Sequence, residues 1–104
     1  EPILEFNLLY FTPGASRGFH YHPEFIEYLL CVDGSGVLVT EEEDSLDDVE
    51  SDAKTPIHLS KGVCTRTDIG TSHTVYAITF MSIVAMLTKP WDECNPPIIR
   101  INDK

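Results

Sequence analysis

Apolar and polar residues alternate in short runs along this chain, and helical periodicity is almost absent. Val, Ile, Thr, Phe and Tyr dominate these runs, as is typical of strands. Gly, Pro, Asp and Ser separate the runs, and the stretch Asp33-Gly34-Ser35-Gly36 predicts a tight hairpin between two of them. Many short strands with such turns indicate an all-β sandwich or barrel. The predicted strands are residues 3–12, 25–32, 36–40, 56–59, 62–69 and 73–87.

An acidic segment, residues 41–52, interrupts the strand pattern. It holds eight of the 17 acidic residues, and because like charges repel and favour water we expect a solvated loop. A cation-binding or regulatory loop is the alternative, although the segment lacks the glycine and the spacing of a calcium loop. The net charge of −10 argues against nucleic acid and anionic membranes as partners, since phosphate binding needs clustered Lys and Arg.

The length of 104 residues leaves room for one core, so residues 1–104 are expected to form a single domain. No basic segment precedes the first strand, and the longest apolar run, residues 77–87, is too short for a membrane span of about 20 residues. Three widely spaced cysteines form no CxxC pair, which favours reduced thiols and a cytoplasmic protein. The proline-rich segment 89–104 is expected to cross the barrel, with Trp91 as an apolar anchor and its isoleucines pairing at an edge. Such an arrangement suits a homodimer.

Two histidines and a glutamate are placed to share one metal ion. His20 and His22 lie one residue apart, so on a strand they point to the same face while Tyr21 points to the other. A turn follows, and Glu27 then lies on the returning strand. A charged side chain within an apolar strand is costly unless it is paired or ligates a metal, which makes Glu27 a candidate ligand.

His73 offers a fourth ligand from a different part of the chain. It begins the long apolar run 73–87, and a strand on the other side of a closed barrel can bring it to the first three residues. Three imidazoles and a carboxylate suit zinc, iron, manganese, nickel or copper, and they leave a coordination position open. The alternative is a metal-free lumen in which the histidines are polar lining and Glu27 pairs with one of them.

The spacing of these residues resembles that of the two conserved motifs of the cupin superfamily. Every spaced position of the first motif is matched, by Gly14, His20, His22, Glu27 and Gly34. The two motifs together cover roughly half of the chain. The resemblance implies a small jelly-roll barrel, the double-stranded β-helix, with a divalent metal ion in its lumen.

The second motif is matched in part. Gly62, Gly70 and His73 have the right spacing, whereas Asp68 stands where the family has proline and Ala77 where it has asparagine. These departures weaken the expected turn but remove no metal ligand.

A further stretch, Arg17-Gly18-Phe19-His20-Tyr21-His22, resembles the opening of cupin domains in bacterial sugar-nucleotide epimerases and capsular-polysaccharide enzymes. Residues 87–101 are similar to the ends of such proteins. The resemblance implies an epimerase or isomerase that binds a nucleotide-linked keto-sugar in the lumen and removes a proton beside the ketone. In related metal-free epimerases the first histidine of this stretch is the base, which corresponds to His20. Arg17 would then pair with a diphosphate, or else be a surface arginine at a strand end.

A histidine that ligates a metal cannot also be a free base. With a bound metal the base must be another group, for which Tyr76 and Tyr28 are the candidates. Two further classes stay open: a metal-dependent dioxygenase, since such a ligand set around iron or copper can activate oxygen, and a non-catalytic cupin that binds a sugar or another small ligand. The identity of the metal distinguishes the dioxygenase from the other two classes, because redox chemistry needs a metal other than zinc. A metal-free, apolar and closed lumen would favour the binding protein.

Overall fold

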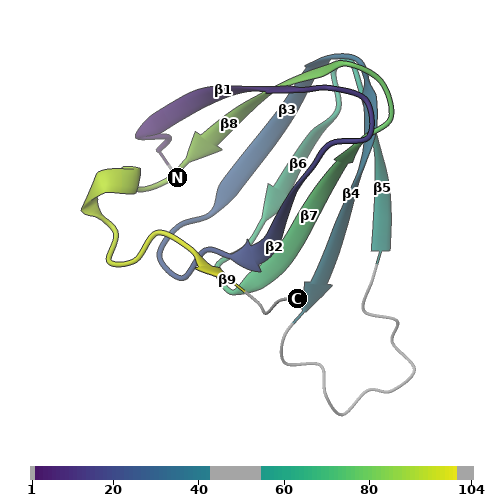
Figure 1. Cartoon of the computed structure of the whole chain (residues 1–104). Coiled ribbons are helices and arrows are strands. Elements are labelled where there is room, and N and C mark those ends of the chain that lie inside the picture. The colour runs from purple at the N-terminus through teal and green to yellow at the C-terminus, as the bar shows by residue number, and fades with distance from the viewer. Residues whose placement is uncertain (1, 43–54, 101–104) are drawn as a thin grey trace.

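The chain folds into two antiparallel β-sheets that face each other (Figure 1). The computed structural model describes residues 2–42 and 55–100. Sheet A consists, in spatial order, of β1 (Glu5–Phe11), β8 (Met81–Leu87), β3 (Glu27–Asp33) and β6 (Cys64–Thr67). Sheet B consists of β5 (Thr55–Ser60), β4 (Ser35–Glu42), β7 (Thr71–Ala77), β2 (Ser16–Tyr21) and β9 (Ile99–Arg100).

Successive strands cross from one sheet to the other, except for the hairpin of β4 and β5. This alternation is the connectivity of a jelly roll, so the predicted all-β fold of the cupin type is confirmed. Most of the acidic segment 41–52 lies outside the described residues, apart from Glu41 and Glu42 at the end of β4. Among the described residues, no helix has the length and apolar character to cross a bilayer.

The predicted hairpin at Asp33–Gly36 is wrong. β3 belongs to sheet A and β4 to sheet B, so the turn carries the chain between sheets rather than between paired strands. Gly34 has a φ of 89°, and a Cβ atom there would lie 2.0 Å from the carbonyl oxygen of Phe80. The glycine is therefore required for close packing of two backbones at a barrel corner.

The predicted strand 73–87 divides into β7 and β8, which lie in different sheets. Residues 78–80 form the corner between them, and there the apolar side chains of Ile78 and Phe80 are 56% and 70% exposed. Residues 73–87 form one continuous apolar run in the sequence because the corner residues are themselves apolar. The pattern of apolar runs also omits β2, whose strand character is indicated only by the spacing of its histidines.

The core lies between the sheets and is built from the inward positions of both. Alternation along β3 buries Glu27, Leu29 and Cys31, as the sequence predicts, and alternation along β8 buries every odd-numbered residue from Met81 to Leu87. Sheet B contributes its own inward residues, Leu38, Leu59, Val75 and Ala77.

The segment after β8 crosses from sheet A to sheet B (Figure 1). It contains the single 3₁₀ turn of the described residues, Trp91–Glu93, and ends in β9, where Ile99 pairs with Tyr21 on β2. Glu24 holds this segment, since its carboxylate accepts from Lys89 Nζ at 2.6 Å and from the backbone N–H of Asn95 at 2.9 Å. The predicted crossing of the barrel and edge pairing are confirmed for Ile99.

Candidate functional site

A cavity of about 130 Å³ opens between the two sheets. Its walls are mainly apolar and come from β1, β2, β3, β7 and β8 and from the segments that follow β2 and β8. Several of these side chains also belong to the hydrophobic core, so the core holds the cavity walls in place. The polar residues of the wall are Asn7, Arg17, His20, His22, Glu27 and His73, and Phe11 and Trp91 add aromatic rings.

Three imidazoles from two neighbouring strands meet in this cavity. His20 lies near the end of β2, His22 one residue beyond it, and His73 on the adjacent strand β7. One ring nitrogen of each lies within 4.8 Å of one ring nitrogen of the others. His22 and His73 are buried and His20 is half-buried. His20 and His22 therefore reach the same cavity, as the sequence predicts.

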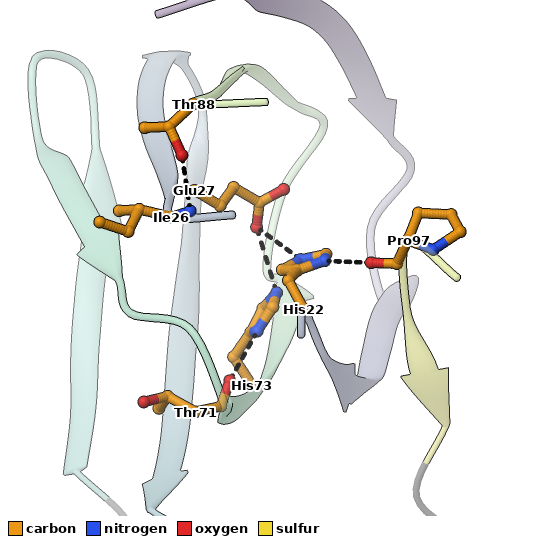
Figure 2. A network of polar contacts seen from close by, with 7 residues as sticks. All are labelled: His22, Ile26, Glu27, Thr71, His73, Thr88 and Pro97. Atoms are coloured by element: carbon orange, nitrogen blue, oxygen red, sulfur yellow. Dashed lines mark hydrogen bonds and ion pairs between the residues drawn. The ribbon is translucent and has the colours of Figure 1, made fainter. Parts of the chain in front are cut away.

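Glu27 enters the cluster from sheet A, on the opposite side of the lumen. Its Oε1 lies 3.4 Å from Nε2 of His22 and 3.2 Å from Nε2 of His73 (Figure 2). Burial by itself would raise the pKa of this carboxyl group, but the contacts with the two histidines outweigh burial and lower the pKa to about 2. The site therefore contains a buried carboxylate that is ionised at neutral pH.

The surrounding contacts orient both buried rings toward Glu27. His22 Nδ1 lies 3.3 Å from the carbonyl oxygen of Pro97, and His73 Nδ1 lies 3.5 Å from that of Thr71 (Figure 2). A carbonyl oxygen only accepts, so each Nδ1 carries the hydrogen and each Nε2 faces the carboxylate. Phe25 stacks on His22 with ring centroids 4.3 Å apart and fixes the plane of that ring.

His20 differs from the other two histidines because no contact with Glu27 holds it. Burial lowers the pKa of His20 to about 4, helped by the nearby His73 and His22 and opposed by a contact with the Gly18 backbone. Its imidazole is therefore neutral at neutral pH and retains a basic nitrogen.

This donor set fits a divalent metal ion. Within the described part of the chain, His20 Nδ1 and His22 Nε2 are buried without a partner of hydrogen-bond geometry, and buried polar atoms rarely stay unpaired. Where an Nε2 lone pair faces a carboxylate oxygen, a proton or a cation must lie between the two acceptors. Two ligands of a tetrahedral zinc ion are about 3.3 Å apart, close to the observed contacts of 3.2 and 3.4 Å. The ring nitrogens, up to 4.8 Å apart, would move inward on binding.

A bulge in β2 brings His20 opposite His73. The register between β2 and β7 shifts between Gly18 and His20, so that Gly18 pairs with Thr74 but His20 pairs with His73. Gly18 has a φ of 139°, and a Cβ atom there would lie 2.4 Å from the carbonyl oxygen of His73. The site thus depends on a glycine that lets two backbones approach beside the histidines.

We expect Gly18→Ala to destabilise the chain by about 3 kcal/mol, because the methyl group must push β2 away from β7 in a backbone conformation that alanine disfavours. Gly62→Ala is the matched control: Gly62 also has a positive φ, 93°, but nothing lies within 4 Å of its missing Cβ. That control should cost only about 1 kcal/mol. Urea denaturation measures both, and equal losses would contradict the packing argument.

Arg17 lines the cavity from β2, where its side chain is largely exposed. None of the ion pairs formed by the described residues involves Arg17. Its guanidinium group is therefore available to a ligand at the cavity mouth.

Tyr76 and Tyr28 are not brought to the site, which corrects the expectation of a tyrosine base. On β7 the residues that point inward are His73, Val75 and Ala77, so Tyr76 points outward and is 40% exposed. Tyr28 occupies the outward phase next to Glu27 on β3. Neither tyrosine lines the cavity.

Sequence reasoning missed Asn7 and Phe25. Asn7 lies on β1 in the same phase as Leu9 and Phe11, and all three line the cavity. A polar residue in the inward phase of an apolar strand is a signal that could have identified Asn7. Phe25 lies in the turn before β3, and nothing in its sequence context indicates that it stacks on His22.

No model of a known protein family matches this chain, and no curated protein sequence matches it either. Solved structures do match. The capsular polysaccharide assembling protein CapF from Staphylococcus aureus superposes with a TM-score of 0.79 at 20% identity, over 95% of this chain and 26% of that one. ChmJ, a 3′-monoepimerase from Streptomyces bikiniensis crystallised with dTDP, gives 0.78 at 17% identity, over 97% and 52% of the two chains. QdtA, a sugar 3,4-ketoisomerase from Thermoanaerobacterium thermosaccharolyticum crystallised with TDP, gives 0.74 at 17% identity, over 94% and 66%.

These likenesses show that the chain shares the jelly-roll fold of these structures. The chain spans from about a quarter to just under two thirds of the length of these matched proteins. At 17 to 20% identity the comparison concerns the fold, and the chemistry must be argued from the residues of this chain.

Proposed function

We propose that this chain binds a divalent metal ion in its lumen and acts as an epimerase or isomerase on a nucleotide-linked keto-sugar. The convergence of three imidazoles and an ionised carboxylate in one cavity carries the proposal. The matched structures include a capsular polysaccharide assembling protein, a 3′-monoepimerase crystallised with dTDP and a sugar 3,4-ketoisomerase crystallised with TDP, which supports the substrate class. The residues that would hold the ion are His20, His22, Glu27 and His73.

In the proposed reaction, a base removes a proton from the carbon next to a ketone. When bound, a divalent metal ion supplies Lewis-acid stabilisation for the negative charge that develops on the ketone oxygen. The chain itself provides a small, mainly apolar cavity for the reacting carbon, and a substrate that fills it would displace water and strengthen the electrostatic interactions inside it.

The size of the cavity decides which part of the substrate enters. At about 130 Å³ it is well below the roughly 300 Å³ of a pocket that encloses a drug-sized ligand. A sugar ring can enter, whereas the nucleotide must stay outside the mouth. Arg17 lies at that mouth and can meet the diphosphate with a bidentate, charge-assisted contact.

His20 has two proposed roles, as the base and as the fourth metal ligand. It is the imidazole that Glu27 does not contact, and its lowered pKa of about 4 keeps it neutral and able to accept a proton. Apart from the other three cluster residues and Arg17, the described residues of the cavity wall include no acid or base. His22, His73 and Glu27 form the preassembled part of the proposed metal site. His20 can either ligate the metal ion or accept the proton, and the two roles exclude each other.

The test uses TDP-4-keto-6-deoxyglucose, the compound bound in one of the ketoisomerase structures. We expect the wild-type chain to exchange a hydrogen next to the ketone with solvent deuterium, as followed by NMR, and His20→Asn to lose this exchange. Metal retained in His20→Asn assigns His20 as the base, and metal lost assigns it as a ligand. Binding without exchange in the wild-type chain would contradict the enzymatic proposal and favour a sugar-binding protein.

We expect Arg17→Ala to weaken binding of thymidine diphosphate by about 2 kcal/mol, or roughly 30-fold, because a charge-assisted contact is lost. Isothermal titration calorimetry measures the change. Arg66→Ala is the control, since Arg66 lies on β6 and pairs with Asp68 at 3.2 Å. Unchanged affinity in Arg17→Ala would remove the diphosphate contact from the proposal.

A further inference from the structure

Two threonines on β6 carry buried hydroxyl groups. Thr65 and Thr67 occupy the inward positions of this strand and are 8% and 1% exposed. Within the described part of the chain, neither hydroxyl oxygen has a hydrogen-bond partner. A buried hydroxyl group has given up its contacts with water, so a fold that leaves it unpaired loses free energy. Each of the two hydroxyl groups is therefore expected to donate to an acceptor that lies close to it.

The strand register gives the two threonines different neighbours. In the antiparallel pair of β3 and β6, Thr67 lies opposite Glu27, whereas Thr65 lies opposite Leu29. All four side chains belong to the buried, inward face of the sheet, where directly opposite residues have Cβ atoms about 4.5–5.5 Å apart. Thr67 thus has a carboxylate as its neighbour, and Thr65 has an apolar side chain.

Glu27 has one oxygen that the histidines do not contact. His22 and His73 both contact Oε1, and Figure 2 shows the second oxygen, Oε2, directed away from both rings. An ionised carboxylate has roughly four acceptor positions, and a buried one is stable only when hydrogen bonds replace the water that it has lost. Oε2 can therefore accept from a donor on the neighbouring strand.

Thr67 is the donor that sheet A places beside this carboxylate. β3 lies between β8 and β6, so that Glu27 has Leu87 on one side and Thr67 on the other. The next inward residue along β3 is Leu29, which is also apolar. Of these flanking side chains in the described part of sheet A, Thr67 alone can donate a hydrogen bond.

We propose that Thr67 is a positioning residue for Glu27, and that its hydroxyl group donates to Oε2 directly or through one buried water. The contact keeps the carboxylate fixed on the side that the histidines do not hold. With the proposed ion bound, the contact also keeps Oε1 directed toward the ion, since ligating carboxylates are themselves hydrogen-bonded. This second role rests on the proposed metal site, whereas the contact itself does not.

A double-mutant cycle in the metal-free chain tests the contact. Thr67→Val removes the hydroxyl group and keeps the shape of the side chain, and Glu27→Met removes the acceptor. In urea denaturation with a chelator at neutral pH, we expect Thr67→Val to lower the midpoint when Glu27 is present and not to lower it in Glu27→Met. Thr65→Val is the matched control, because Thr65 has the same strand, face and unpaired hydroxyl group but lies opposite Leu29. It should leave the midpoint unchanged or raise it in both backgrounds.

Equal effects of Thr67→Val in the two backgrounds would overturn the contact. Near-UV circular dichroism verifies that each variant is folded. If Glu27→Met does not fold, the comparison of Thr67→Val with Thr65→Val in the otherwise unchanged chain decides: Thr67→Val must lower the midpoint while Thr65→Val does not.

Titration with zinc tests the positioning role. Isothermal titration calorimetry should show about 10-fold weaker binding in Thr67→Val, because a group that orients a ligand is lost. Thr67→Ser keeps the hydroxyl group and should bind more tightly than Thr67→Val, and Thr65→Val should bind as the wild type does. Unchanged affinity in Thr67→Val would overturn the positioning role. A wild-type chain that binds no zinc would overturn it together with the proposed metal site, while the metal-free cycle still decides whether Thr67 contacts Glu27.

Discussion

His22→Ala is expected to lower the affinity of the chain for a divalent metal ion at least about 100-fold, because even the loss of a residue that only orients a ligand costs 10- to 100-fold. His22 is 2% exposed, and its Nε2 faces both the carboxylate of Glu27 and the other imidazoles. The strands should still form, since the core residues between the sheets are unchanged. Elemental analysis after dialysis gives the metal content, and circular dichroism gives the fold.

His58→Ala is the control for this variant. His58 lies on β5, is exposed and has its Nε2 3.1 Å from the hydroxyl of Ser35, outside the cavity. It should retain the metal content of the wild type. Equal metal in His22→Ala and wild type would refute the ligand assignment. Elemental analysis also identifies the ion. Bound iron or copper, together with oxygen consumption, would favour a dioxygenase.

Glu27→Gln is expected to destabilise the metal-free chain by about 3 kcal/mol at neutral pH, because two contacts of buried imidazoles with a carboxylate are weakened. Urea denaturation in the presence of a chelator measures this loss. Glu24→Gln is the matched control, since Glu24 makes its contacts with Lys89 and Asn95 at the surface, where such pairs contribute little. A loss as small as that of Glu24→Gln would contradict the buried role of Glu27.

The pH dependence of stability distinguishes the same variants. The pKa of Glu27 is about 2 in the folded chain and 4.5 as the ordinary value, so its stabilising effect is complete above pH 4.5 and is lost as the pH falls toward 2. The pKa of His20 is about 4 against 6.5, so the unfolded chain takes up a proton between these values and stability falls there as well. The metal-free wild type should lose stability steadily below pH 6.5. In Glu27→Gln, the part of this pH dependence that comes from Glu27, below pH 4.5, should be absent.

The spacing of His20, His22, Glu27 and His73 was sufficient to predict that these side chains lie together. Strand alternation correctly assigns His20 and His22 to one face and Glu27 to the inward face of β3. The same alternation excludes Tyr76, which lies three residues after His73 and so on the opposite face. A tyrosine hydroxyl suits a base chemically, but the two-residue period of the strand decides which side chains face the cavity.

The jelly roll itself was predictable as a class but not in its connections. A turn signal such as Asp33–Gly36 shows that the chain reverses, and it does not show whether the next strand joins the same sheet. The corner at residues 78–80 carries apolar side chains, so hydrophobicity could not reveal it. Contacts between distant segments, such as Phe25 on His22 and Glu24 on Asn95, depend on the completed fold and leave no local pattern.

The chain contains a single tryptophan, and the crossing segment places it in the cavity wall. Trp91 lies near Phe25, whose ring stacks on His22, with 6.3 Å between the centroids of Trp91 and Phe25. Under excitation selective for tryptophan, the fluorescence of the unlabelled chain therefore originates from one indole beside the histidine cluster. Its emission and quenching would report the binding of the proposed ion or sugar in the lumen without any engineered probe.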